Sequence, residues 1–354
     1  MTTPSPTEQL ASDISALQTR VGWMQDNVRL KNVQNAIEDL QTTLNNMPQR
    51  LVKLRADGYV FEKYLEGQAA AFPQQWKGIH LPLLNQINQQ TASLQSSMRT
   101  IEMKMTQLNG SRGNIAVARS QMSVIENEMS MLEDKVRSAE TTLNGMFDSF
   151  SSEVNSLNSH LNSIDYMLTQ LAEAKFTLLP TEAGLHAVKA VWAKDVKERK
   201  EDPDGILYLT DQRLIFEQKE EIATKKFLFI TTETQKVQEL KWEIPVALVD
   251  QVTTSKLGML KNEDHLDIRF KEGSPIETVH LHIWEECTEW LKLINRAKIR
   301  DFDKDRTVPI DQAVADKVKA IPSQCPSCGA NMGQVVLRGQ DSVKCDYCGF
   351  VIRI

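Results

Sequence analysis

The chain has 354 residues, which is more than one hydrophobic core normally serves, because single cores stop growing at roughly 250 to 300 residues. Hydrophobic residues make up 41% and charged residues 25%, which excludes a chain that is disordered throughout. The net charge of −6 divides into −3 for residues 1–175, −4 for 176–302 and +1 for 303–354. No segment therefore has the strongly basic character of a nonspecific nucleic-acid binder.

The sequence carries no sign of membrane insertion or secretion. No apolar run reaches the roughly 18 residues that span a bilayer, and the first residues lack the basic and apolar stretches of a signal peptide. Four of the five cysteines form two CxxC pairs near the C-terminus, a usage typical of metal binding in a reducing compartment. We therefore expect a cytoplasmic protein, with a peripheral membrane location as the alternative.

Residues 1–175 carry apolar side chains at alternating steps of three and four, which is the heptad pattern of a coiled coil. The first of these apolar seams covers residues 10–47 and slips in phase after Val28, and Pro48 should end its helix. A second seam covers residues 84–108, beginning at Leu84. The pattern predicts at least two long helices in this region.

Residues 109–114 contain two glycines and predict a tight reversal that makes these helices antiparallel. A third seam, over 118–171, slips after Phe150 and predicts one helix of roughly 85 Å, too long to fold alone in water. Residues 50–75 have the composition of a further helix. A helical hairpin or three-helix bundle is one outcome, and self-association through the overhanging helix is the outcome that we expect, with the oligomer number open.

Residues 176–302 change to the two-residue period of strands, followed by helical spacing over 284–298. The predicted strands are Leu185–Lys194, Gly205–Thr210, Arg213–Gln218, Lys226–Thr231, Val237–Glu243, His265–Phe270 and Ile276–His282. Seven strands and one closing helix fit a small barrel that is capped at one end.

Two segments of this region resemble GRAM-type pleckstrin-homology-like (PH-like) domains. The run from Gly205 to Phe216, GILYLTDQRLIF, is similar to the second and third strands of that family. The run from Trp242 to Leu260 resembles the segment that follows its fourth or fifth strand. The resemblance covers about 120 residues and implies a seven-stranded PH-like β-barrel with a C-terminal capping helix, a fold that hosts lipid, peptide and purely structural roles.

In lipid-binding members of that superfamily, basic residues between the first two strands contact phosphate oxygens together. The resemblance places four cations in that loop: Lys194, Lys197, Arg199 and Lys200. Five acidic residues in the same stretch leave it one charge negative, so a solvated loop with local ion pairs explains the pattern equally well. A membrane phospholipid is one candidate ligand of this domain, and the hypothesis that we favour is that the domain docks a protein partner.

His280 and His282 share one face of a predicted strand, at a spacing that can bind a metal. The sequence shows no third ligand, so we interpret both as packed or exposed imidazoles. The chain also lacks a phosphate-binding P-loop, a glycine-rich dinucleotide turn and a GxSxG motif, and we expect that it is not an enzyme.

The strongest motif lies in residues 323–354, where two CxxC pairs are separated by sixteen residues. The predicted metal ligands are Cys325, Cys328, Cys345 and Cys348. Gly329 and Gly349 follow the second cysteine of each pair and let backbone amides approach the sulfurs. The segment resembles a zinc ribbon. Because four thiolates leave no open coordination position, we predict one structural Zn²⁺ and no catalytic one.

Residues 335–338 and 342–344 alternate around Gly339 as the two strands of a hairpin would. Residues 303–322 have the composition of a linker with a short helix, so we expect a flexibly tethered ribbon. The ribbon offers a small mixed surface of cations and rings: Arg338, Lys344 and Arg353 with Tyr347 and Phe350.

The sequence thus predicts a multidomain chain: an all-α coiled-coil or helical hairpin (1–175), a PH-like domain (176–302), a linker (303–322) and a zinc ribbon (323–354). The predicted function is that of a non-enzymatic oligomeric scaffold or adaptor that docks protein partners, with a membrane surface as a further contact. The alternative is a nucleic-acid-associated regulator that uses the ribbon as its binding module.

Overall fold

The computed structural model describes residues 5–194, 198–227, 230–258, 262–319 and 321–354. The chain separates into two compact units. The helical unit comprises Met1–Pro48 and Gln68–Asn158, and the sheet unit comprises Gln49–Gly67 and Ser159–Ile354. Each unit is described by itself below.

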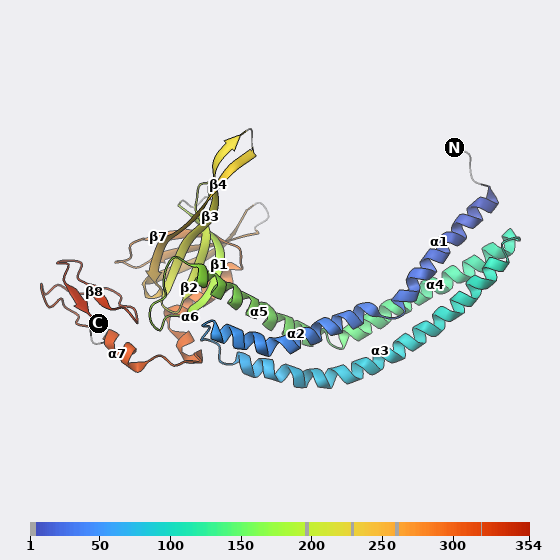
Figure 1. Cartoon of the computed structure of the whole chain (residues 1–354), viewed down its shortest axis with the longest axis horizontal. Coiled ribbons are helices and arrows are strands. Elements are labelled where there is room, and N and C mark those ends of the chain that lie inside the picture. Colours follow the sequence, from blue (N-terminus) through green and yellow to red (C-terminus); the bar gives the residue numbers. More distant parts are fainter. Residues whose placement is uncertain (1–4, 195–197, 228–229, 259–261, 320) are drawn as a thin grey trace. The chain divides into compact units, whose positions relative to one another are not determined.

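The predicted all-α region is confirmed. Its helices are α1 (Pro6–Asn27), α2 (Lys31–Ala56), α3 (Leu65–Gly110), α4 (Ile115–Gly145) and α5 (Asp148–Glu173). In the helical unit α1 and α4 run side by side (Figure 1), and Arg20 of α1 holds Glu133 of α4 through two hydrogen bonds of 2.6 and 2.7 Å. The seam residues from Leu10 to Met47 are buried, as are those from Ala118 to Leu143, so the chain itself covers the predicted coiled-coil stripe.

The phase slip after Val28 corresponds to the break between α1 and α2, where the buried Leu30 has a φ of +54°. The prediction that Pro48 ends the helix is wrong, because α2 continues to Ala56. Proline removes one backbone hydrogen bond, but burial of Met47 and Leu51 on either side of Pro48 holds the helix together.

Three further helix predictions are corrected. The single helix over 118–171 is interrupted, because α4 ends at Gly145 and α5 begins at Asp148, with the buried Phe147 between them. On α3 the buried residue is Leu83, and Leu84 is exposed. Residues 50–75 form no separate helix; they divide between α2, α3 and a connecting loop in which the Arg55 guanidinium donates to the Tyr59 and Phe61 carbonyls.

The sheet unit contains the predicted PH-like fold. Its strands are β1 (Gly184–Ala193), β2 (Asp204–Thr210), β3 (Arg213–Phe227), β4 (Ile230–Pro245), β5 (Val249–Leu257), β6 (Glu263–Phe270) and β7 (Thr278–Ile283). They form one antiparallel sheet in the order β4-β3-β2-β1-β7-β6-β5, and helix α6 (Cys287–Lys298) follows β7. Phe216, Leu281 and Trp290 are fully buried and mark the core between sheet and helix.

Two strand assignments differ from the sequence prediction. The predicted strands 213–218, 226–231 and 237–243 belong to the two long strands of one β3–β4 hairpin, which extends beyond β2 (Figure 1). Of the predicted strand 226–231, residues 228 and 229 lie outside the described part of the chain. Strand β5 was not predicted, because this edge strand buries little beyond Val249 and shows no clear alternation.

Short elements complete the sheet unit. They are the 3₁₀ helices η1 (Val246–Leu248) and η2 (Asp301–Asp305), helix α7 (Gln312–Lys319) and the strands β8 (Ser342–Lys344) and β9 (Val351–Arg353). The loop between α2 and α3 packs against η2, since Phe61 contacts Phe302 edge to face and Thr307 N–H donates to the Val60 carbonyl at 2.7 Å. Within the described residues, no helix combines the length and the apolar composition needed to cross a membrane.

Candidate metal centre at the C-terminus

Two turns of the same construction carry the four cysteines. In the first, Cys325 N–H donates to the Ala330 carbonyl and Gly329 N–H donates to the Cys325 carbonyl, both at 2.8 Å. The second turn repeats these bonds, from Cys345 to Phe350 at 2.8 Å and from Gly349 to Cys345 at 2.9 Å. Gly329 and Gly349 have φ values of +73° and +74°, a conformation that glycine adopts without strain. The two CxxC pairs therefore form two equivalent turns.

The four sulfurs of Cys325, Cys328, Cys345 and Cys348 all lie within 4.8 Å of one another. The Sγ atoms of Cys325 and Cys348 are 3.6 Å apart, and those of Cys328 and Cys345 are 3.8 Å apart. A tetrahedral Zn²⁺ with bonds of about 2.3 Å to sulfur requires S–S separations of about 3.8 Å. The cysteine cluster therefore fits a four-coordinate metal ion with no open position.

The thiols of this cluster differ in acidity. The backbone amide of Cys328 lowers the pKa of the Cys325 thiol to about 7. The amide of Ala330 acts in the same direction on Cys328, but the neighbouring Cys348 thiol and burial outweigh it and raise the pKa of Cys328 to about 12. Four thiolates without a cation would repel one another, so full ionisation of the cluster requires a metal ion.

The predicted hairpin around Gly339 is wrong in its pairing. Strand β8 pairs with β9, and residues 335–338 form no ladder. They pack instead against the turn between β2 and β3, where Arg338 and Gln212 exchange two hydrogen bonds of 2.6 and 3.1 Å. A side chain at Gly339 would meet the Pro180 carbonyl at 2.3 Å, so only glycine allows this approach.

Arg338 anchors the ribbon through its side chain as well. It pairs with Asp211 in the β2–β3 turn and donates to Asp303 at 3.1 Å. Arg306 also donates to Asp211, at 2.8 Å, and Ala183 N–H donates to its other oxygen at 3.0 Å. Burial raises the pKa of Asp211, and this amide and the two arginines act in the opposite direction. The expectation of a flexibly tethered ribbon is therefore corrected: a buried ion-pair network holds it on the PH-like domain.

The mixed surface predicted on the ribbon divides in two. Arg338 is only 5% exposed and belongs to the buried network, so it offers nothing to a nucleic acid. Tyr347, at 78% exposure, Phe350 and Val351 stand in solvent, and Lys344 and Arg353 are also exposed. A small apolar surface with two cations remains.

The four cations predicted in the anion-binding loop are only partly brought together by the structure. Lys197 lies outside the described residues. Lys194 lines a groove on the sheet, whereas Arg199 and Lys200 are exposed but absent from its lining. The Asp202 carboxylate organises the loop from within, accepting from Arg199 N–H at 2.7 Å. Of the described cations of the loop, only Lys194 lines the groove.

A second group of potential metal donors consists of Asp264, Glu286 and Cys287. The Lys256 ammonium already lies between the two carboxylates, 2.7 Å from Asp264 and 2.9 Å from Glu286. Burial raises the pKa of the Cys287 thiol. A lysine thus supplies the positive charge at this group, and the cysteine stays protonated.

No model of a known protein family matches the sequence, and no curated protein is similar to it. Solved structures that align with the chain include the DH/PH domains of p115-RhoGEF, at 13% identity and a TM-score of 0.21, over 82% of this chain and 90% of that one. The DH/PH fragment of PDZRHOGEF, solved with human RhoA, aligns at 11% identity and a TM-score of 0.24, over 84% and 96%. At these TM-scores the similarity identifies neither a family nor an activity.

Proposed function

We propose that the chain is a non-enzymatic adaptor whose PH-like domain and zinc ribbon dock protein partners together. The observation that carries this proposal is the anchoring of the ribbon on the β2–β3 turn through Arg338, Gln212 and Asp211. Two domains joined by a buried ion-pair network present their surfaces in a fixed relation, as a composite docking site requires.

Zinc has a structural role in this proposal. The four cysteines would hold one Zn²⁺, which supplies folding free energy to a segment too small to form a core. Among the described residues 323–354, only Val343 and the two cysteines Cys325 and Cys345 are buried besides Arg338. The metal therefore takes the place of apolar packing.

The partner surface that we propose consists of Tyr347, Phe350 and Val351 at the second cysteine turn. Exposed aromatic side chains on a rigid turn lose little conformational entropy on binding, and such residues commonly dominate the energy of protein interfaces. Lys344 and Arg353 beside them favour a partner with acidic groups at its rim.

Affinity capture from a nuclease-treated extract tests this surface. We expect partners retained by the wild-type chain to be lost from a Tyr347→Ser/Phe350→Ser variant and kept by a Val308→Ser variant, which alters an exposed apolar residue outside the ribbon. An unchanged set of partners in the double variant would remove the ribbon from the proposal. A turnover reaction that survives replacement of the four cysteines would contradict its non-enzymatic part.

A nucleic-acid-associated regulator is the second candidate, favoured by the exposed rings of Tyr347 and Phe350 between two cations. Bases stack on such rings, and each phosphate contact makes the affinity depend on salt. Binding of a labelled single strand that falls steeply between about 50 and 200 mM salt would support this function. Binding that stays undetectable at the lower salt concentration would dismiss it.

We propose that self-association, which the heptad pattern predicts, uses the outer face of α4. The seam side chains are covered within the chain, but Val117, Val124 and Met131 remain exposed at seven-residue spacing on that helix. Light scattering should give a multiple of 40.1 kDa for the wild type and one chain mass for Val124→Lys. The exposed Met103→Lys on α3 is the matched control, and a monomeric wild type would refute the proposal.

A membrane surface is the remaining proposed contact, through Lys194, Arg199 and Lys200 of the loop between β1 and β2. Sedimentation with vesicles containing anionic phospholipid tests it. Retention should weaken severalfold when all three are replaced by alanine, whereas equal retention would leave this loop without a role in lipid binding.

A further inference from the structure

The register of β6 and β7 brings three histidines and an aspartate to one patch of the sheet. His265 lies directly opposite His282, and Asp267 lies directly opposite His280. Because side chains two residues apart on a strand share a face, all four project from the same side. The sequence showed His280 and His282 without a third ligand, and the neighbouring strand supplies it in His265.

The three imidazoles form a stack with too few hydrogen-bond partners. The ring centroids of His265 lie 4.7 Å from His282 and 5.3 Å from His280. His265 is 3% exposed and His280 is 8% exposed. Among the described residues, neither ring nitrogen of His265 has a partner within hydrogen-bond distance, although Nε2 lies 3.7 Å from the Glu263 carboxylate, and Nε2 of His280 has none either. Buried polar atoms without a partner destabilise the folded state, and a bound ligand would satisfy them.

Two carboxylates orient the other ring nitrogens. Nδ1 of His282 lies 2.7 Å from an oxygen of Glu198, and Nδ1 of His280 is bonded to Asp267. A histidine that donates Nδ1–H to a carboxylate keeps its Nε2 lone pair for a metal ion, which is the usual outer-shell arrangement of metal sites.

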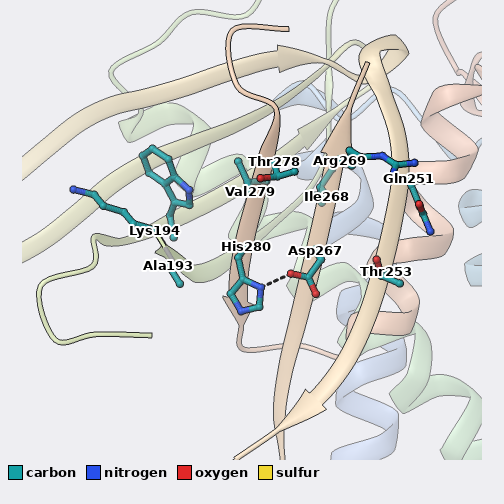
Figure 2. A pocket seen from close by; sticks show the side chains of 11 residues that line it. Ala193, Lys194, Gln251, Thr253, Asp267, Ile268, Arg269, Thr278, Val279 and His280 are labelled. Atoms are coloured by element: carbon teal, nitrogen blue, oxygen red, sulfur yellow. Dashed lines mark hydrogen bonds and ion pairs between the residues drawn. The ribbon is translucent and has the colours of Figure 1, made fainter. Parts of the chain in front are cut away.

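Of the four residues, His280 and Asp267 line a groove of about 840 Å³ on the sheet. Figure 2 shows His280 and Asp267 in its wall, joined by their hydrogen bond, with Thr253 beside them. Lys194 and Arg269 also line the groove, and Arg269 is paired with Asp250 at 2.7 Å. The Asp267 carboxylate, 47% exposed, faces solvent where a cation would enter.

We infer that His265, His280 and His282 form a second metal site, for a divalent transition metal such as Ni²⁺, Cu²⁺ or Zn²⁺. Three imidazoles are a ligand set that these borderline ions prefer, and Glu198 and Asp267 supply compensating negative charge. The site is distinct from the cysteine cluster and independent of the adaptor function.

Binding requires the three rings to move toward one another. The histidine nitrogens are not among the donor groups that already lie within 4.8 Å of one another in the described chain. A metal with bonds of about 2.0 Å needs nitrogens about 3.3 Å apart, so at least one pair of ring nitrogens must approach by more than about 1.5 Å. A bound metal would replace the stacking of the three rings with coordination by their nitrogens.

The test uses the full chain with the cysteine site first filled by one equivalent of Zn²⁺, followed by titration with Ni²⁺. We expect one further Ni²⁺ per chain, bound at least tenfold more weakly by His265→Gln and by His280→Gln. Glu198→Gln should weaken binding about tenfold through its effect on His282. His160→Gln, a histidine paired with Glu62 elsewhere in the sheet unit, is the matched control and should bind as the wild type does.

A wild-type chain that takes up no metal beyond the first equivalent would overturn the inference, as would equal Ni²⁺ binding by wild type, His265→Gln and His280→Gln. Circular dichroism establishes that the variants are folded. A second experiment uses the wild-type chain alone. Electron paramagnetic resonance of bound Cu²⁺ should show hyperfine coupling to imidazole nitrogens, and a spectrum without this coupling would also overturn the inference.

Discussion

The PH-like domain and the ribbon differ in the interactions that stabilise them. The PH-like domain buries a continuous apolar core between its sheet and α6, in which Leu207, Phe216 and Trp290 are inaccessible to solvent. The ribbon buries almost no apolar surface, and we expect its order to depend on a metal ion held by the four sulfurs. Apolar burial grows with the number of residues that share a core, so a segment of about thirty residues must rely on other interactions.

The two regions should therefore respond differently to a single substitution. Loss of one contact in an apolar core leaves many others, whereas the ribbon has a few interactions that each carry much of its free energy. We therefore expect substitutions in the ribbon to act in an all-or-none manner and substitutions in the PH-like core to act gradually. Three predictions test this contrast, and a fourth concerns the loop between α2 and α3.

The largest effect is expected from replacement of one of the four metal ligands. Cys345→Ser should abolish order in the ribbon, because structural zinc contributes on the order of 10 kcal/mol or more to domains of this size. Metal analysis should change from one zinc per chain to none, and amide exchange in residues 323–354 should become fast. A Cys287→Ser variant, altering the buried cysteine of α6, should keep the zinc. Retained order in Cys345→Ser would contradict the metal-based view of the ribbon.

Arg338→Ala should have the next largest effect. It leaves Asp211 buried with one of its two arginines, and removing one partner from a buried ion pair commonly costs about 3 to 5 kcal/mol. We expect the ribbon to separate from the PH-like domain while keeping its zinc, which protease sensitivity of the 306–322 segment would detect. The exposed Arg353→Ala is the control. If both variants resist protease equally, the network does not hold the ribbon.

Leu281→Ala tests the opposite side of the contrast. Its side chain is fully buried on β7, so truncation should cost about 2 to 5 kcal/mol and lower the urea midpoint of the sheet unit. Zinc content should stay at one per chain, since the ribbon does not depend on this side chain. A simultaneous loss of zinc would mean that the two regions unfold together.

The smallest effect concerns Glu62, in the loop between α2 and α3. Burial acts to raise the pKa of this carboxyl, but hydrogen bonds with His160, Tyr59 and Tyr64 outweigh it and lower the pKa below its usual value. Glu62 therefore stabilises the folded state above about pH 4.5, and this contribution is lost as the pH falls toward its lower value in the folded protein.

Glu62→Gln should flatten the acid limb of stability against pH, by at most about 1.4 kcal/mol per pH unit. Urea midpoints at several values between pH 6 and 3 provide the measurement, with the exposed Glu153→Gln as the control. Parallel acid limbs for wild type and Glu62→Gln would remove Glu62 as their cause.

The parts of the fold that depend on local pattern could be predicted from the sequence. The heptad seams, the reversal at 109–114 and the two cysteine turns all rest on residues close together in the chain, and the structure confirms them. Pro48 and the break at Gly145 could not be predicted, because tertiary packing decides whether a helix tolerates a proline or continues through a phase slip.

Contacts between distant residues account for most of what the sequence could not reveal. Asp211 and Arg338 are 127 residues apart, and nothing local distinguishes Arg338 from the exposed Arg353. The cluster of His265 with His282 depends on the register between β6 and β7, which a single sequence does not encode in a readable form. The long β3–β4 hairpin was divided into three strands because its alternation is irregular.

Asp211 accepts from Arg306 at the start of the segment leading to the ribbon and from Arg338 within the ribbon itself. The two arginines are thus linked both through the chain and through their shared ion pair with Asp211. A single backbone cut between them would leave the ribbon seated on the PH-like domain, so the nicked protein should migrate as one species under native conditions and as two fragments after denaturation.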